Sequence, residues 1–309
     1  MITMIWERLK VWRRLTAGPI RLVYKFERTP FTTSGSRNHR ITKASNVRVT
    51  VPAFDFNESD TTQPEEFASH TTLSRGTAVV VGVGPGFGYA VARHLVAEGF
   101  DLVMVSRNAD RLTPLATELK KKYGGRISVH SADATDEQSV DQMFQMILTT
   151  YGVPKLVIYS IQEFSPGETL DVSVPAFESA WRHNCLGAFL ISRAAGRAMK
   201  QENSGTILLI GSTSSILARE GHLNLAIGKF GQRALAQVLA RELWPSGIHV
   251  AHVLIDADIS EDSSKELLGT KSSPEDIAVS LLALHEQPRT AWSSEMDLRP
   301  WNEKFWEHC

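Results

Sequence analysis

The sequence TAVVVGVGPGFG, at Thr77–Gly88, joins a short apolar run to a glycine-rich turn. The apolar residues Ala78–Val81 are typical of a strand buried on both faces. A segment with helical periodicity follows at residues 87–98. A glycine turn between a strand and a helix presents backbone N–H groups and the positive end of the helix dipole to a phosphate. We therefore expect a phosphate-binding turn, with a plain strand-to-helix turn as the alternative.

The spacing of the glycines distinguishes between two forms of such a turn. The fingerprint G-x-G-x-x-G is not matched, because Phe87 or Tyr89 stands at the third glycine position in the two possible frames. The spacing G-x-x-x-G-x-G is matched by Gly82, Gly86 and Gly88. We predict that these glycines, together with Phe87, contact a dinucleotide.

From Arg75 onward, short apolar runs alternate with segments of helical periodicity. Strands are predicted near residues 77–83, 101–106, 126–131, 155–160, 205–211, 247–254 and 295–298. Helices are predicted at about 87–98, 108–122, 136–150, 175–200, 224–243 and 274–286. This alternation predicts a doubly wound parallel α/β sheet, with its ligand crevice at the carboxyl ends of the strands.

Composition indicates one moderately large domain. The chain has 309 residues, of which 42% are hydrophobic and 22% charged, and its net charge of −1 gives no indication of nucleic-acid binding. Only two cysteines occur, so a disulfide framework is not expected and a reducing compartment is favoured. No apolar run reaches the roughly 18–20 residues of a membrane-spanning helix. We predict no metal site.

Residues 1–72 differ from the rest of the chain and are interpreted as an extension outside a domain at 73–309. Residues 1–50 hold eleven Lys and Arg against two acids, whereas the remainder holds 22 basic and 32 acidic side chains. An Arg-rich, acid-poor N-terminus resembles a mitochondrial presequence. A flexible basic arm, a misassigned start and a segment lying on an anionic membrane are the alternatives. The expected location is therefore cytoplasmic or mitochondrial.

The end of the second predicted strand bears on the choice of cofactor. An NAD enzyme places Asp or Glu there, about twenty residues after the glycines, to hold the ribose 2′-hydroxyl. This chain has Ser106 and Arg107 instead. A guanidinium suits a 2′-phosphate, so we predict NADP(H) rather than NAD(H). A solvated arginine at a strand end is the alternative.

Three polar residues complete a resemblance to the short-chain dehydrogenase/reductase family, which uses the G-x-x-x-G-x-G turn and a Rossmann-type sheet. Asn184 stands where that family has an asparagine that bends a helix. Ser212 lies thirteen residues before position 225, which is the family's serine-to-tyrosine distance. Lys229 stands where the family's lysine binds the nicotinamide ribose. The resemblance implies catalytic roles for all three residues. The alternatives are that Ser212 only forms a turn, with Ser214 as the possible catalytic serine, and that Lys229 is a surface lysine.

The resemblance also implies a contact between Asp133 and the adenine edge of the cofactor. This residue follows the third predicted strand, in the sequence ADATD at 132–136. The alternative is that Asp133 or Asp136 caps the next helix, and Asp136 is the better candidate for that role. Ser260 could replace the threonine that holds the nicotinamide carboxamide in the family.

Several positions depart from the family pattern. Leu225 replaces the tyrosine that donates the proton in the family. Residues 159–162 read YSIQ where the family has N-N-A-G, so Gln162 replaces a glycine beside the cofactor ribose. Ile255 and Asp256 replace a proline and a glycine. The segments at 233–243, 247–256 and 290–301 resemble a poorly characterised branch of the family in which this tyrosine is commonly phenylalanine.

These features predict an NADPH-dependent oxidoreductase that acts on a small organic substrate. Because Leu225 cannot donate a proton, reduction of an iminium or imine is favoured over reduction of a carbonyl. The alternatives are a cyclase or pericyclic catalyst, a non-enzymatic NADP(H)-binding protein, and carbonyl reduction with an acid supplied by His222 or Tyr159. The resemblance also implies a homo-oligomer, dimer or tetramer, paired through the helices at about 175–200 and 224–243.

Overall fold

The computed structural model describes residues 74–259 and 271–303. The extension predicted at residues 1–72 lies outside the described residues, and so does Ser260. What the sequence predicts for those positions stays a prediction.

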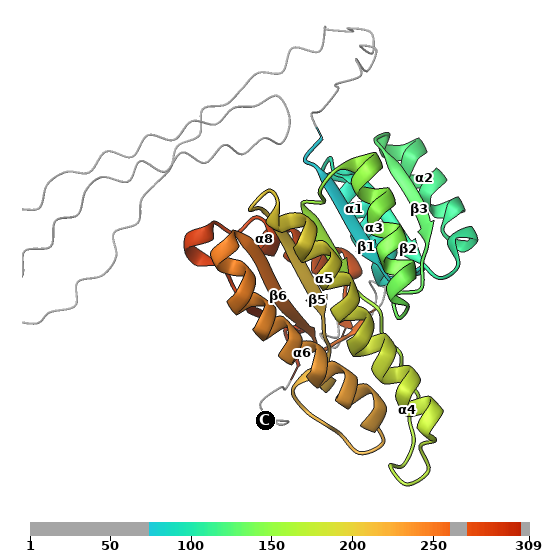
Figure 1. Cartoon of the computed structure of the whole chain (residues 1–309). Helices are drawn as coiled ribbons and strands as arrows, with labels where there is room; N and C mark the ends of the chain where they lie inside the picture. Colours follow the sequence, from blue (N-terminus) through green and yellow to red (C-terminus); the bar gives the residue numbers. More distant parts are fainter. Residues whose placement is uncertain (1–73, 260–270, 304–309) are drawn as a thin grey trace, which may run out of the picture. The chain divides into compact units, whose positions relative to one another are not determined.

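A parallel sheet forms the centre of the described part of the chain (Figure 1). Its strands are β1 (Thr77–Val81), β2 (Asp101–Ser106), β3 (Ile127–Ser131), β4 (Leu156–Tyr159), β5 (Gly205–Ile210), β6 (Ile248–Ile255) and β9 (Glu295–Leu298). They lie in the order β3-β2-β1-β4-β5-β6-β9, and every neighbouring pair is parallel. The strand order reverses between β1 and β4, where doubly wound sheets bind their ligands. The predicted fold and all seven predicted strands are confirmed.

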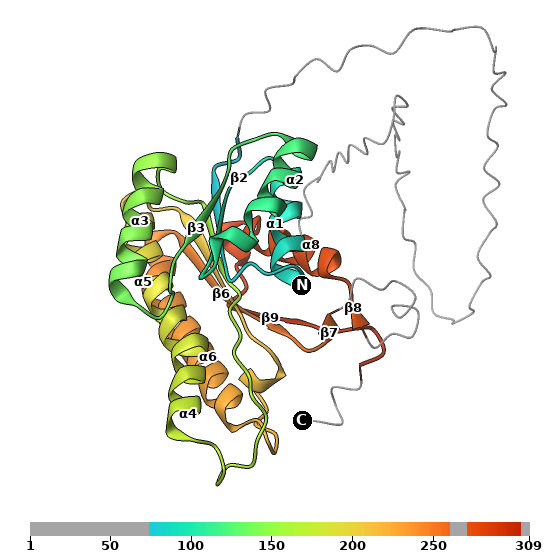
Figure 2. The same ribbon diagram turned by 90° about the vertical axis from the view of Figure 1, so that its right-hand side faces the viewer.

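Helices cover both faces of the sheet (Figure 2). One face carries α1 (Phe87–Ala97), α2 (Thr113–Tyr123) and α8 (Pro274–His285). The other carries α3 (Glu137–Tyr151), α4 (Val174–Trp181), α5 (Gly187–Lys200) and α6 (Leu223–Leu243). With both faces covered, each central strand must be apolar throughout, which explains the unbroken apolar runs in the sequence.

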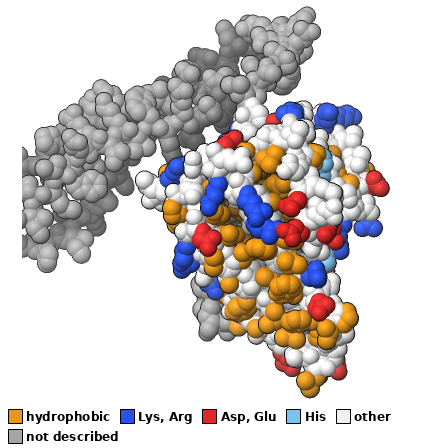
Figure 3. Space-filling model, viewed as in Figure 1, with side chains coloured by type: hydrophobic (Ala, Val, Ile, Leu, Met, Phe, Trp, Pro, Cys, Tyr) orange, Lys and Arg blue, Asp and Glu red, His pale blue; other side chains and the backbone are white. Residues whose placement is uncertain are grey.

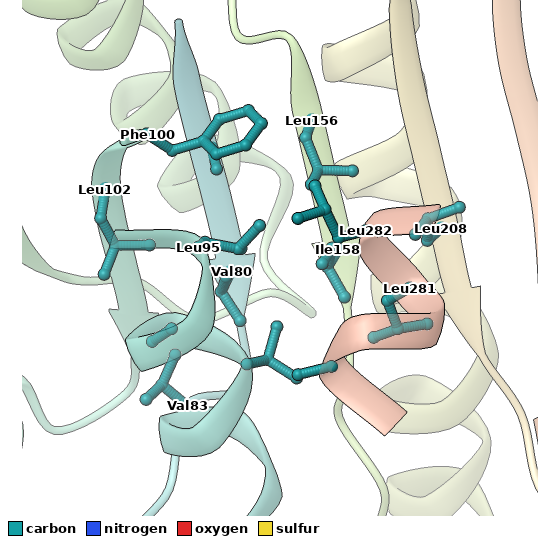
Figure 4. Close-up of a cluster of buried hydrophobic side chains, with 14 of the residues drawn as sticks. Val80, Val83, Leu95, Phe100, Leu102, Leu156, Ile158, Leu208, Leu281 and Leu282 are labelled. Carbon is teal, nitrogen blue, oxygen red and sulfur yellow. The ribbon is translucent and has the colours of Figure 1, made fainter. Parts of the chain in front are cut away.

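Successive side chains of a strand enter different cores. Val80 and Ile158 point into the layer of α1 and α8, where they lie near Leu281 (Figure 4). Val79 and Val157 belong to the core on the α3, α5 and α6 side. Because the strands are parallel, the carboxyl ends of β1, β4, β5 and β6 lie at one edge of the sheet.

Three details differ from the predicted elements. The helix expected at 108–122 begins as a 3-10 turn, η1 (Ala109–Arg111), and becomes α-helical at α2. The helix expected at 175–200 is interrupted by a π-helical turn, η2 (Arg182–Leu186), between α4 and α5. A further small parallel sheet pairs β7 (Asp258–Ile259) with β8 (Lys271–Ser272), which are too short to give a sequence signal.

Candidate active site

The glycine turn between β1 and α1 is tight at its two ends and open in its middle. A Cβ at Gly82, where φ is +94°, would lie 2.9 Å from the backbone N of Ile161. A Cβ at Gly88 would lie 2.9 Å from Cα of Val83. At Gly86, by contrast, no atom of the described chain lies within 4 Å of the Cβ position. The outer glycines therefore permit chain packing, and the space at Gly86 fits the phosphates of a dinucleotide.

Phe87 begins α1 directly after this turn. The first turn of any helix leaves N–H groups without acceptors inside the helix, and these groups suit an anion. The Phe87 side chain also lines the cleft described next, so the predicted phosphate site and the cleft are continuous.

A cleft of about 680 Å³ lies at the carboxyl ends of the strands. Its walls include the predicted residues Ser212 and Lys229, together with Leu225 and Gln162. The other lining residues are Phe87, Ser160, Phe164, Ile210, Gly211, Thr213, Ser214, Arg219, His222, Ile255, Asp256, Ala257, Asp258, Ile259 and Glu303. A larger depression along α3 contains none of the predicted residues. The structure thus brings the serine, the lysine and position 225 into one cleft.

Lys229 is held in the floor of the cleft. Its side chain is buried on α6, and Nζ donates to the carbonyl oxygens of Ile210 at 2.8 Å and Ile161 at 3.2 Å. A third bond joins Nζ to Oε1 of Gln232 at 3.3 Å. Burial lowers the pKa of the ammonium group to about 7. Lys229 is therefore not a surface lysine, and its three acceptors hold the ammonium group in place.

Asn184 sits in the π-helical turn η2 and is fully buried. Its Nδ2 donates to the carbonyl oxygen of Glu163 at 2.7 Å, and its Oδ1 accepts the N–H of the same residue at 3.2 Å. A Cβ at Gly228 would lie 2.5 Å from Cβ of Asn184, so this glycine allows α6 to pack against the turn. Asn184 therefore ties the segment after β4 to η2, although its side chain does not line the cleft.

Ser212 follows β5 and precedes the 3-10 turn η3 (Thr213–Ser215). Its backbone N–H donates to Oγ of Ser215 at 3.1 Å. Its own Oγ is buried and makes no hydrogen bond with any described residue. A buried hydroxyl without a partner costs free energy, so a substrate or water that bonds to it is favoured.

His222 and Tyr159 are the two residues predicted to supply a proton in place of the tyrosine that Leu225 replaces. Tyr159 is fully buried, its hydroxyl donates to the carbonyl oxygen of His183, and burial raises its pKa. It does not line the cleft, so the structure contradicts its use as the proton donor. His222 does line the cleft, where its ring stacks on Phe164 with centroids 4.8 Å apart. Of these two residues, His222 is the one placed to reach a substrate.

Ser106, Arg107 and Asp133 lie at the carboxyl ends of β2 and β3. Oγ of Ser106 accepts the N–H of Asn108 at 3.3 Å. Nη1 of Arg107 lies 3.2 Å from Nε2 of His183 in η2, which brings the guanidinium beside the turn that carries Asn184. The geometry leaves Arg107 exposed at the outer end of the crevice.

The carboxylate of Asp133 folds back on its own turn. Burial acts to raise its pKa, but the N–H and the hydroxyl of Thr135, both 2.8 Å from Oδ1, bring the pKa below its ordinary value. Asp136 caps α3, since its Oδ2 accepts the N–H of Ser139 at 2.9 Å. Capping by Asp136 is confirmed, and Asp133 keeps one carboxylate oxygen for another partner.

Asp256, which with Ile255 replaces the family's proline–glycine turn, accepts hydrogen bonds from the Thr213 hydroxyl and from Arg299, and these bonds fix the turn after β6. The cleft also contains two residues that the sequence reasoning missed. Phe164 and Arg219 line the opening of the cleft. They lie in loops without periodicity or motif spacing, so no sequence signal could place them there.

Comparison with known proteins gives consistent matches. The family model described as short chain dehydrogenase matches residues 76–265. An uncharacterized oxidoreductase of Staphylococcus aureus (strain MRSA252) is 28% identical over 233 residues, covering 74% of this chain and 99% of the relative.

Solved structures show the same likeness. The structure of a short-chain dehydrogenase from Rhodopseudomonas palustris is 32% identical, with a TM-score of 0.65, and covers 73% of this chain and 99% of its own. A metagenomic short-chain oxidoreductase in complex with NADP is 23% identical, with a TM-score of 0.66, over 74% of this chain and 98% of its own. The second match shows the fold alone. None of the described helices has the length and apolar character needed to cross a membrane.

Proposed function

Because the chain belongs to the short-chain dehydrogenase family, we propose that it is an NADPH-dependent oxidoreductase that reduces the C=N bond of a small imine or iminium substrate. The observation that carries this proposal is a cleft that combines Ser212 and Lys229 with Leu225. The open space at Gly86 and the N-terminus of α1 are the places that would hold the cofactor phosphates.

NADPH supplies a hydride when it is bound. On an iminium, this hydride would add to carbon while the π electron pair moves to nitrogen and neutralises its charge; a neutral imine would first take a proton from water to become the iminium. No proton donor is needed for this step. Reduction of a ketone instead creates an alkoxide, and a general acid there is typically worth about 10²–10⁴-fold in rate. Leu225 offers no such acid, which favours the C=N substrate.

The residues of the cleft have separate roles in this proposal. Ser212, whose hydroxyl is buried at the wall of the cleft, would bond to the substrate. Lys229 would contact the ribose of the cofactor from the floor of the cleft, as the family resemblance implies, by exchanging one of its three acceptors in the chain. Burial lowers the pKa of its ammonium group, so this contact would depend on pH. Asn184 holds the segment after β4 in place through Glu163.

Preference for NADPH over NADH is proposed from Ser106 and Arg107. No carboxylate stands at the end of β2 to repel a 2′-phosphate, and the guanidinium of Arg107 is exposed there. The NADP complex of the metagenomic neighbour is an observation on that protein, and it illustrates that this fold accommodates the cofactor. Gln162, at the edge of the cleft, is expected to weaken binding relative to a glycine.

Two measurements test the proposed function. Fluorescence titration should give a several-fold lower Kd for NADPH than for NADH, and Arg107→Ala should abolish the difference. Oxidation of NADPH in the presence of methylpyrroline, a stable cyclic imine, should exceed oxidation in the presence of simple ketones. Equal affinities at low salt would contradict the cofactor assignment. Rapid oxidation of secondary alcohols would contradict the substrate class.

Carbonyl reduction with His222 as the acid is the second candidate, because that imidazole lines the cleft with Leu225 and Ser212. A ketone reductase activity that His222→Phe removes, with NADPH binding unchanged, would favour this candidate over imine reduction.

Self-association is a further part of the proposal. Trp181 on α4, Phe189 on α5, and Ile227 and Phe230 on α6 are 38%, 38%, 45% and 41% exposed. In Figure 3, hydrophobic side chains gather over the region where Figure 1 places these helices. A contiguous exposed apolar patch favours a protein–protein contact. Light scattering should therefore give at least a dimer, and Phe230→Glu should shift the population toward the monomer.

A further inference from the structure

A chain of buried polar groups lies beneath the Ser212 loop. His252, on β6, is fully buried, and its Nε2 lies 3.2 Å from Oγ of Ser215. The same Oγ accepts the backbone N–H of Ser212 at 3.1 Å. Ser215 is also fully buried, so its hydroxyl is not exposed to act as a nucleophile. The imidazole of His252 is therefore linked through the Ser215 hydroxyl to the backbone of Ser212, which lines the cleft.

The other side of the imidazole faces an ion pair. Nδ1 of His252 lies 3.4 Å from Oε2 of Glu295, at the start of β9. Arg233, on α6, donates to the two carboxylate oxygens of Glu295 at 2.6 and 2.8 Å. Two parallel bonds of this kind fix the orientation of a carboxylate. The polar chain thus joins α6, β9 and β6 to the loop after β5.

The hydrogen bonds define the direction of the protons. Oγ of Ser215 accepts the N–H of Ser212, and its own proton can be donated to Nε2 of His252. In that tautomer the imidazole proton is on Nδ1, which lies 3.4 Å from the carboxylate of Glu295 and makes no hydrogen bond with any described residue. Burial lowers the pKa of His252 to about 4, which is consistent with a neutral ring at physiological pH.

Close packing excludes other side chains at this place. A Cβ at Gly211, directly before Ser212, would lie 2.2 Å from Nε2 of His252 and 2.6 Å from Oγ of Ser215. Because these are fixed atoms of a buried network, they cannot easily move aside. Glycine at 211 is required for the imidazole to lie directly under the loop.

We propose that His252 is a positioning residue, which acts through Ser215 to hold the backbone of Ser212 and so fixes the Ser212 side chain at the wall of the cleft. The role of Ser212 at the substrate rests on the proposed function. Leu225 brings no hydroxyl to the substrate, and Oγ of Ser212 is buried against the backbone of its own turn, in a capping box with Ser215. The orientation of this hydroxyl therefore depends on its backbone, and the backbone depends on Ser215 and His252.

Amide hydrogen exchange of the peptide that covers residues 211–217 tests the structural half of the proposal without a substrate. Ser215→Ala and His252→Phe should each raise exchange in this peptide by at least about fivefold, the equivalent of one lost hydrogen bond. Their double variant should exchange no faster than either single variant, because the two residues act in series. His252→Gln should restore protection, since its amide oxygen replaces the acceptor at Nε2.

His249→Phe is the matched control. His249 lies on the same strand and is equally buried, but it bonds to the carbonyl oxygen of Ser293 and stacks on Trp292. It should leave exchange at 211–217 as in the wild type. Exchange that rises equally in the His249 and His252 variants would mean general loosening and would overturn the proposal. Nitrogen NMR of the His252 ring should find the proton on Nδ1, and a proton on Nε2 would also overturn it.

The functional half is measured with methylpyrroline and NADPH. His252→Phe should lower kcat by about tenfold, as expected when a reacting group is slightly misplaced, with the Kd of NADPH unchanged. His252→Gln should recover most of kcat. Absence of turnover in the wild type would count against the proposed function, whereas exchange and the NMR tautomer would still decide the positioning role. Unchanged kcat in an active His252→Phe protein would overturn that role.

Discussion

Leu225 presents an apolar side chain to the cleft, 4% exposed, at the position where the family resemblance implies a phenol. Around it, Ser212 keeps an unpartnered hydroxyl and Lys229 keeps three hydrogen bonds to oxygen atoms of the protein. Nothing in this arrangement requires a tyrosine for stability, because Lys229 finds its acceptors in the chain itself. The side chain at position 225 therefore decides whether the cleft has a proton donor, while Ser212 and Lys229 keep their places.

Leu225→Tyr should create ketone reductase activity. The new phenol would stand on the same helix as Lys229, and a correctly placed general acid is worth about 10²-fold or more. NADPH oxidation in the presence of a simple ketone measures the gain. Leu225→Phe is the control, since it adds the ring without the hydroxyl. If the two variants have equal activity, the tyrosine is not poised for proton transfer.

Spacing along the chain predicted part of this site. The thirteen residues between Ser212 and position 225, and the four from there to Lys229, carried the resemblance, and the cleft contains all three positions. The roles assigned to these residues stay predictions. His252 could not be found in this way, because its partners come from three distant elements and are joined by folding.

At the scale of elements, the π-helical turn η2 determines how α6 approaches the cleft. One extra residue in the turn displaces Asn184 and Cys185 toward α6, and glycines at 228 and 231 make room for them. A Cβ at Gly231 would lie 2.8 Å from Sγ of Cys185. The pairing of a bulge on one helix with two glycines on the next brings the lysine-bearing helix close to the sheet.

Gly228→Val should therefore destabilise the protein by about 2–3 kcal/mol, the cost of overpacking a closed interface. Its side chain would collide with Asn184 and push α6 away. Urea unfolding measures the loss. Gln237→Ala, at an exposed position of the same helix outside the apolar patch, should change the free energy of unfolding by less than about 0.5 kcal/mol. Equal effects of the two substitutions would show that α6 does not pack tightly on η2.

Most elements were predictable, and the exceptions have physical causes. Strands buried on both faces give unbroken apolar runs, and helices against the sheet give a clear 3.6-residue period. A π-turn inserts a single residue, which hardly disturbs that period over a helix of this length, so periodicity alone predicts an unbroken helix at 175–200. Only the family resemblance implied a bend at Asn184, where the structure has η2. The start of α2 was placed too early because the 3-10 turn η1 continues the same polar pattern.

At the scale of the whole molecule, buried histidines make stability depend on pH. Burial lowers the pKa of His252 and of His285 from 6.5 to about 4. Between these pH values the two imidazoles bind protons in the unfolded chain but stay neutral in the folded chain. The free energy of unfolding is therefore highest above pH 6.5 and falls as the pH drops toward 4.

The midpoint of urea unfolding should accordingly be lower at about pH 5 than at about pH 7.5. His285→Gln removes one of the two groups and keeps a hydrogen-bonding partner for Thr206, so it should reduce this difference. The same midpoint for the wild type at both pH values would contradict the burial of neutral histidines.

A protein that begins at Thr71 should fold and bind NADPH like the full chain, because the first strand starts at Thr77. Circular dichroism and the NADPH titration are the measurements. Loss of folding or of cofactor binding would mean that the removed residues 1–70 contribute to the domain. Fusing residues 1–60 to a fluorescent reporter separates mitochondrial import from a diffuse cytosolic signal.

The small sheet β7–β8 holds the two ends of the segment at residues 260–270 next to each other, with Asp258 paired to Lys271. For a segment whose ends are already held together, each doubling of length adds only about 0.6 kcal/mol of entropic cost. Insertions and deletions can therefore accumulate between β7 and β8 without endangering the fold. Because Asp258 and Ile259 line the cleft, such length changes would alter its border first. A change in the length of this segment is therefore expected to alter the fit of a substrate in the cleft while the central sheet stays unchanged.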